Sequence, residues 1–85
     1  MTNLWTGKIT STEYQKLTTI SEVSFEEGIT YLLQAQNGDI YLREGTTGKG
    51  FIVPSEKVVQ YTHDTLDLYV AKVFKLDDVF LNIAI

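Results

Sequence analysis

The stretch "YLLQAQNGDIYLREG", residues 31–45, decides the fold that the sequence predicts. Its first half continues an alternation of apolar and polar side chains that begins at Ile29, which is the pattern of a β-strand with one buried face. At its centre, Asn37 and Gly38 tolerate positive φ and suit a two-residue type I′ turn. The stretch therefore predicts two antiparallel strands joined as a hairpin.

A two-residue turn also predicts the register of this hairpin, in which Ala35 faces Ile40. The apolar face of the ribbon consists of Leu33, Ala35, Ile40 and Leu42. A slip of one residue would move this whole set to the wrong side. The opposite face is mixed and consists of Leu32, Gln34, Gln36, Tyr41 and Arg43. We expect such a face to be half-solvated, or covered by a second sheet or another copy of the chain.

The rest of the chain predicts more strands around this ribbon. Thr, Val and Ile account for 25 of the 85 residues, and their branching at Cβ suits a pleated sheet. Further strands are expected over 51–54, 56–62, 66–74 and 79–85. The last of these is apolar on both sides, so it should be central or sandwiched. Thr12 and Gln15 fit a capping box, which predicts at most one short helix near residues 12–19.

Together these patterns predict one all-β domain over residues 1–85. Its architecture should be a small antiparallel β-sandwich or flattened barrel of about six to seven strands. The chain is 44% hydrophobic and 21% charged, which is typical of a folded globular protein. It has no cysteine, so the core or self-association must supply the stability that disulfides give other small domains.

The charge balance bears on the class of partner. The formal net charge is −4, Arg43 is the single arginine, and the lysines form no cluster, which argues against nucleic acid as a partner. No apolar run reaches the roughly 18 residues of a membrane helix, and the amino terminus lacks a signal-peptide pattern. We expect a soluble protein that does not insert into membranes.

Three features suggest reactive chemistry and are better explained by structure. The loop "GTTGKG", residues 45–50, has the wrong spacing for a nucleotide-binding loop and is expected to be a flexible connector. His63 in "YTHDT" has no orienting partner beside it in a strand. The pairs 26–27 and 77–78 lack the spaced ligand series of a calcium loop and are expected to be solvated charges. We therefore expect no catalytic residue, no metal, no cofactor and no enzymatic activity.

The aromatic residues are better candidates for binding. Large rigid rings serve protein interfaces and also stack on sugars. Tyr41 lies on the mixed face, and Trp5 lies near the terminus. The candidate contact residues are therefore Trp5, Leu32, Tyr41 and Arg43.

The order of elements also resembles the small accessory proteins encoded among the head and tail genes of bacteriophages and prophages. The residues that carry the resemblance are Gly28, Tyr31, Gln34, Gly38, 41–44, 54–56 and the segments "LDLYVAKV" and "VFLNIAI". One departure is Ser55, where such proteins often have glycine after the proline. The resemblance covers most of the chain, consists of strand and turn residues, and offers no catalytic residue to carry over.

The resemblance implies a compact β-sandwich that joins a virion as a decoration, tail or fibre-associated component. The expected function is thus non-enzymatic: self-association into a homo-oligomer and binding to other virion proteins. The expected location is the virion, or the host cytoplasm before assembly. The alternative is a β-sandwich module that binds a carbohydrate or another component of the host surface.

Overall fold

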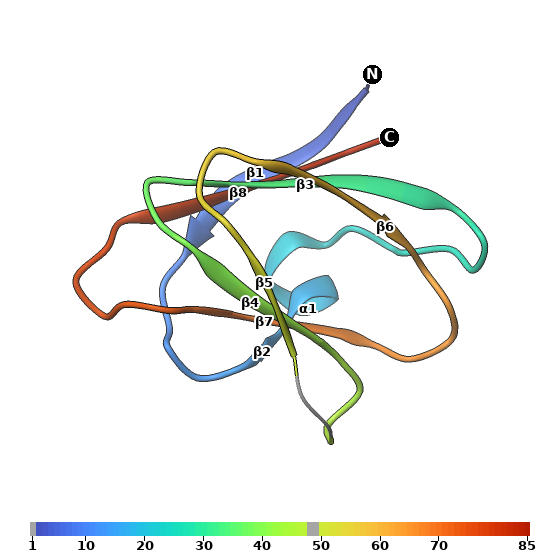
Figure 1. Cartoon of the computed structure of the whole chain (residues 1–85). Coiled ribbons are helices and arrows are strands. Elements are labelled where there is room, and N and C mark those ends of the chain that lie inside the picture. The colour runs from blue at the N-terminus through green and yellow to red at the C-terminus, as the bar shows by residue number, and fades with distance from the viewer. Residues whose placement is uncertain (1, 48–49) are drawn as a thin grey trace.

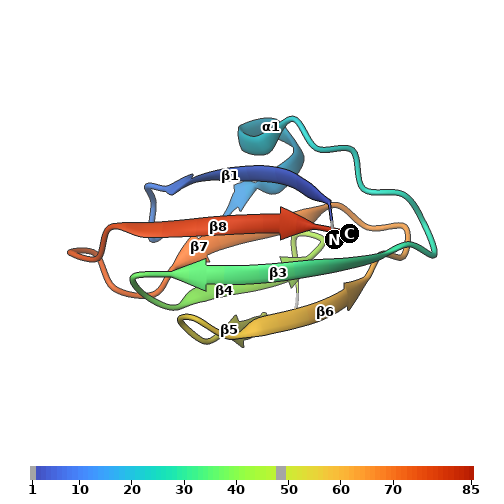
Figure 2. The same ribbon diagram turned by 90° about the horizontal axis from the view of Figure 1, so that it is seen from above.

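The computed structural model describes residues 2–47 and 50–85, which form two stacked β-sheets (Figures 1 and 2). The elements of this part of the chain are β1 Asn3–Ile9, β2 Gln15–Lys16, α1 Leu17–Ser21, β3 Thr30–Gln36, β4 Ile40–Glu44, β5 Phe51–Val53, β6 Val58–Thr62, β7 Leu68–Lys72 and β8 Val79–Ala84. The first sheet has the order β1-β8-β3-β6 and the second the order β2-β7-β4-β5. Pairing between these strands is antiparallel. The expected all-β sandwich with one short helix is confirmed, with eight described strands.

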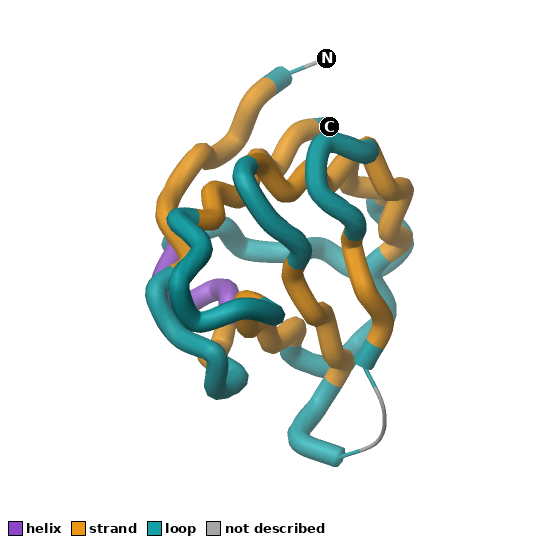
Figure 3. Tube along the Cα trace, turned by 60° about the vertical axis from the view of Figure 1, so that its left-hand side comes forward, coloured by secondary structure: helices purple, strands orange, loops and turns teal. Residues whose placement is uncertain are grey.

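The chain passes back and forth between the two sheets. Among the described strands, β4 and β5 are consecutive and also paired, whereas the other connections cross from one layer to the other (Figure 3). The strands expected over 51–54, 56–62, 66–74 and 79–85 correspond to β5, β6, β7 and β8. The expected connector over 45–50 includes Gly48 and Lys49, which lie outside the described residues.

The predicted hairpin across Asn37 and Gly38 is wrong. β3 pairs with β6 and β8, while β4 pairs with β5 and β7, so the two strands belong to different sheets. The turn is instead a corner that carries the chain across the sandwich. Asn37 has φ 63° and Gly38 has φ 151°. Both residues thus adopt the positive φ that the sequence indicated, but they do so in a corner between two sheets and not in a hairpin turn.

This corner is held by a second corner, at residues 54–57, where the chain passes from β5 to β6. The Gly38 amide donates to Ser55 Oγ at 3.0 Å, and the Ser55 amide donates to Asp39 Oδ1 at 2.7 Å. The Asn37 amide donates to Glu56 Oε1 at 3.0 Å. Ser55, which departs from the glycine expected by resemblance, thus supplies a hydroxyl that glycine lacks.

The core lies between the two sheets and is made by the inward side chains of both. Leu33, Ala35, Ile40 and Leu42 are all fully buried, as the alternation predicted. They meet from opposite sheets instead of lying side by side on one ribbon. β8 is central in its sheet and directs Val79, Leu81 and Ile83 inward, each with no exposed surface, which confirms the expectation for the last strand.

The first twenty residues differ most from the sequence prediction. β1 was not predicted, and the helix expected near residues 12–19 is α1, which begins at Leu17 and ends at Ser21. The capping box of Thr12 and Gln15 is wrong, because Gln15 and Lys16 pair with β7, and Lys16 caps α1 without a side-chain hydrogen bond. Leu17, the first residue of α1, is fully buried.

Candidate functional site

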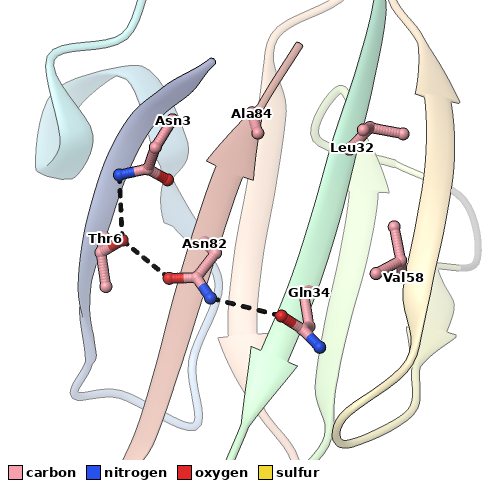
Figure 4. Close-up of a pocket in the computed structure, with 7 residues that line it drawn as sticks. All are labelled: Asn3, Thr6, Leu32, Gln34, Val58, Asn82 and Ala84. Carbon is pink, nitrogen blue, oxygen red and sulfur yellow. Dashed lines mark hydrogen bonds between the residues drawn. The ribbon is translucent and has the colours of Figure 1, made fainter. Parts of the chain in front are cut away.

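The outer face of the first sheet is hollowed where its four strands lie side by side (Figure 4). The hollow has a volume of about 400 Å³, within the range of ligand sites in proteins. It is lined by Asn3, Thr6, Leu32, Gln34, Val58, Asn82 and Ala84. Antiparallel register places these residues in rows across the sheet: Asn82 faces Thr6 on one side and Gln34 on the other. None of these seven described residues carries a charge.

A chain of hydrogen bonds joins the polar side chains of the hollow across three strands. Asn3 Nδ2 donates to Thr6 Oγ1 at 3.3 Å, and Thr6 Oγ1 donates to Asn82 Oδ1 at 2.7 Å. Asn82 Nδ2 then donates to Gln34 Oε1 at 3.4 Å, as Figure 4 shows. Gln34 Nε2 in turn donates to the Glu56 carbonyl at 3.2 Å. We call the side chains of Asn3, Thr6, Asn82 and Gln34 the polar ladder.

The other side of the hollow is aliphatic. Leu32 and Val58 lie on the neighbouring strands β3 and β6, and Ala84 of β8 pairs with Leu32 on the other side of β3. Val58 lies on the edge strand β6 and is 57% exposed, although its side chain is apolar. Each amide of the polar ladder uses only one of its two N–H groups in these bonds. The hollow therefore offers an incoming molecule both unbonded amide N–H groups and an aliphatic surface.

A second exposed apolar feature is the loop between β7 and β8, residues 73–78. Phe74 is 60% exposed and Leu76 is 94% exposed, the largest value among the exposed apolar side chains. The sequence predicted a strand as far as Phe74, but β7 ends at Lys72, and the chain turns with the Asp77 amide donating to the Phe74 carbonyl at 3.2 Å. A leucine exposed to this extent places an apolar side chain in water without cover from its own chain.

The base of the 73–78 loop is braced against the sandwich. Lys72 is only 8% exposed, and its Nζ donates to the Asp77 carbonyl at 3.0 Å. The Val73 amide donates to the Asp39 carbonyl at 3.2 Å. Asp78 forms an exposed ion pair with Lys8 of β1 at 3.1 Å. The loop therefore presents Leu76 from a fixed base.

The structure separates the residues that sequence analysis placed on one mixed face. Leu32 lines the hollow on the first sheet, whereas Tyr41 and Arg43 lie on the second sheet, where they face Ala71 and Tyr69 of β7. The prediction that these three residues share one face is wrong, because it depended on the hairpin. Whether these residues contact a partner stays a prediction.

On the second sheet Arg43 is enclosed by aromatic rings. Its Cζ lies 4.0 Å from the centre of the Tyr14 ring and 5.7 Å from that of Tyr69. Its Nε donates to the Gly45 carbonyl at 3.2 Å. Arg43 thus has partners within its own chain, of the cation–π kind that stabilises a packed guanidinium.

Trp5 is also engaged within the chain. It is partly buried and packs against the core. A Cβ at Gly7 would clash with the Trp5 indole, so the indole covers the backbone of Gly7. This arrangement explains why residue 7 has no side chain, and it directs much of the indole away from solvent.

His63 belongs to an aromatic cluster with Phe25 and Tyr61. Its Nδ1 lies 2.7 Å from the Tyr61 hydroxyl, and its ring centre lies 5.6 Å from that of Phe25. Burial of the Tyr61 hydroxyl, with smaller effects from the charges of Glu44 and Asp64, raises the pKa of Tyr61 to about 12. A phenol with that pKa stays protonated at neutral pH, where it can donate to the imidazole.

Sequence reasoning missed most of the hollow. Asn3, Thr6, Val58 and Asn82 become neighbours only through pairing between distant strands, which no local pattern reveals. Leu76 did leave a signal, because "VFKLDD" places two large apolar residues among charges just before a strand.

The described residues show neither a metal-binding cluster nor a membrane-spanning helix. In the described part of the chain, His, Asp and Glu side chains form no group of three that could hold a metal ion. Among the same residues, no helix has the length and apolar character that a membrane crossing requires. Comparison with protein-family models, with curated proteins and with solved structures finds no match to this chain.

Proposed function

We propose that this protein is a non-enzymatic structural protein of a phage or prophage, which self-associates and binds a larger virion assembly. The observation that carries the proposal is the 73–78 loop, whose braced base presents Phe74 and Leu76 to solvent. Exposed apolar side chains on a fixed loop are the kind of anchor that protein interfaces bury. The resemblance of the strand and turn residues to phage accessory proteins supplies the viral context.

The partners in this proposal are other copies of the chain and other virion proteins. The chain would then reside in the virion, and in the host cytoplasm before assembly. A formal net charge of −4, from eleven acidic and seven basic residues, suits protein partners better than phosphate backbones.

Purified particles provide the test. Particles from a strain that carries the gene are isolated on a density gradient, and this chain is quantified against a known capsid protein by mass spectrometry. A constant, stoichiometric copy number in intact particles is the expected result. Particles that assemble normally and lack the chain would overturn the proposal, and so would a gene whose neighbours are unrelated to phages.

The hollow supports a second candidate, binding of a neutral carbohydrate. The polar ladder lines a space of about 400 Å³ with amides and a hydroxyl, groups that can bond to sugar hydroxyls. A glycan array tests this candidate. Asn82→Ala in the ladder should abolish binding, while Tyr41→Ala on the second sheet should leave it unchanged. An array without any bound glycan would reject it.

A further inference from the structure

We propose that Asn37 is the site at which this chain undergoes spontaneous deamidation, and that hydrogen bonds from the corner to Ser55 and Glu56 hold the reaction back. The site lies in the corner between β3 and β4, where Asn37 is exposed and precedes a glycine. The modification converts the Asn37 side-chain amide to a carboxylate, with water as the only co-reactant. It goes beyond the proposed function and does not depend on a virion role.

The reaction takes place within the backbone of the corner. The Gly38 backbone nitrogen loses its proton to a solvent base and attacks Cγ of Asn37, so that a new C–N bond closes a five-membered succinimide ring. The bond from Cγ to Nδ2 breaks, and Nδ2 takes up a proton and leaves as ammonia. Water then adds to one of the two ring carbonyls, and the C–N bond that opens returns a proton to the nitrogen. Opening at one carbonyl yields aspartate, and opening at the other yields isoaspartate, in which the backbone runs through the side chain.

Sequence context distinguishes Asn37 from the other asparagines. Asn37 is followed by glycine, whereas Asn3 is followed by leucine and Asn82 by isoleucine. No side chain hinders the approach to a glycine nitrogen, and glycine gives the backbone the freedom that ring closure requires. Asn3 and Asn82 also lie in the paired strands β1 and β8, where the ladder fixes the backbone.

In the folded corner the attacking nitrogen is held by a hydrogen bond. The Gly38 amide donates to Ser55 Oγ at 3.0 Å, and the Asn37 amide donates to Glu56 Oε1 at 3.0 Å. Ser55 is itself fixed, because its amide donates to Asp39 Oδ1 at 2.7 Å. Ring closure needs rotation of the backbone between Asn37 and Gly38, so the corner must first open and break these bonds. The rate should therefore depend on how often the corner opens.

Packing around Gly38 also resists this rotation. A Cβ at residue 38 would lie 2.6 Å from Val79 Cγ2, and Val79 has no exposed surface. Figure 2 shows the corner at the same end of the sandwich as the corner between β5 and β6 and the loop between β7 and β8. The peptide group at Gly38 is thus enclosed by neighbouring segments, although the preceding residue is exposed.

Negative charge around the corner opposes the reaction as well. The Glu56 carboxylate lies at the Asn37 amide, and Asp77 Oδ2 would lie 2.8 Å from a Cβ at residue 38. The attacking nitrogen becomes anionic before the ring closes, and nearby carboxylates raise the free energy of that anion. The product places a further carboxylate beside Glu56, and isoaspartate also lengthens the backbone by one carbon. Both changes should loosen the corner once the reaction has occurred.

Peptide mapping by mass spectrometry measures the reaction, because the carboxylate product is heavier than the amide. The full chain is incubated at mildly alkaline pH, folded in buffer and unfolded in guanidinium chloride. In the unfolded chain Asn37 should convert first, while Asn3 and Asn82 stay intact over the same time. In the folded chain Asn37 should convert at least about tenfold more slowly than in guanidinium chloride.

Ser55→Ala tests the hydrogen bond at the attacking nitrogen. Loss of the acceptor should raise the rate at Asn37 by roughly 5- to 100-fold, up to the rate in the unfolded chain, because an N–H group without its partner favours opening. The matched control is Ser24→Ala, the same change at an exposed serine between α1 and β3, which should keep the wild-type rate. Glu56→Ala removes the acceptor of the Asn37 amide at an exposed residue and should also raise the rate.

Hydrogen exchange followed by nuclear magnetic resonance separates opening of the corner from unfolding of the whole chain. In Ser55→Ala the Gly38 amide should exchange faster, while the amides of the central strand β8 stay protected. If Ser55→Ala unfolds the whole chain, Glu56→Ala carries the test, and a folded Glu56→Ala chain with the wild-type rate would overturn the inference.

Three other results would overturn it: conversion of Asn37 in the folded wild type as fast as in guanidinium chloride, equal rates in folded Ser55→Ala and Ser24→Ala, or conversion of Asn3 or Asn82 before Asn37.

Discussion

Replacing Gly38 with alanine tests the corner between β3 and β4, because the consequences differ between a corner and a hairpin. In the structure a Cβ at residue 38 would lie 2.6 Å from Val79 Cγ2 and 2.8 Å from Asp77 Oδ2. Val79 is fully buried in the central strand β8, so it has little room to move. In an open hairpin turn the same methyl group would project into solvent.

The magnitude follows from two contributions. Gly38 has φ 151°, a conformation that residues with a side chain rarely adopt, which costs about 1–3 kcal/mol. Crowding against Val79 adds about 1–3 kcal/mol. Gly28 is the matched control, because its φ is 82° and a Cβ there would meet nothing within 4 Å. Gly28→Ala should cost only the backbone strain, about 1–2 kcal/mol.

Urea denaturation followed by the fluorescence of Trp5, the single tryptophan, measures both variants. The expected loss for Gly38→Ala is about 2–6 kcal/mol, a large part of the roughly 5–15 kcal/mol that stabilises a small domain. Equal losses for the two variants would refute the reasoning, because they would show that residue 38 has space for a side chain.

Three further predictions concern the core, the interlocked corners and the buried phenol. Leu81→Ala, at a position without exposed surface, should lower the free energy of unfolding by about 2–5 kcal/mol. Val58→Ala, at an exposed position, should change it by less than about 0.5 kcal/mol. Similar losses for the two variants in urea denaturation would contradict this prediction. Ser55→Ala leaves the Gly38 amide without its acceptor and should cost about 1–3 kcal/mol in the same assay, and an unchanged midpoint would rule out that bond. In an ultraviolet titration Tyr61 should ionise near pH 12, and Tyr61→Phe should remove that step. Since the folded pKa of this phenol exceeds the unfolded value near 10, stability should fall as the pH rises from about 10 to 12, and Tyr61→Phe should lessen the fall.

The side of each strand that faces the core could be predicted from the sequence, because alternation is a local property. Leu33, Ala35, Ile40 and Leu42 are buried whether β3 and β4 form a hairpin or face each other across a sandwich. The choice between these arrangements could not be predicted, because Asn37 and Gly38 accept positive φ in either. Contacts of the turn with residues 54–57 and with Asp77 distinguish the two arrangements, and these residues are distant in the sequence.

The candidate site was only partly predictable for the same reason. Leu32 was identified from the mixed face and does line the hollow. Tyr41 and Arg43 were assigned to the same face through the hairpin register, and that assignment failed with the hairpin. Asn82 stood out only as the single polar residue of an apolar strand, and its role in the polar ladder depends on β1 and β3 lying on either side of β8.

Backbone nuclear Overhauser effects across the sheets test the central claim, that the Asn37–Gly38 turn is a corner between two sheets. The structure predicts cross-strand contacts between Gln34 and Asn82 and between Tyr41 and Ala71. Cross-strand contacts between Gln34 and Tyr41, with none from Gln34 to Asn82, would instead establish the hairpin and contradict the account.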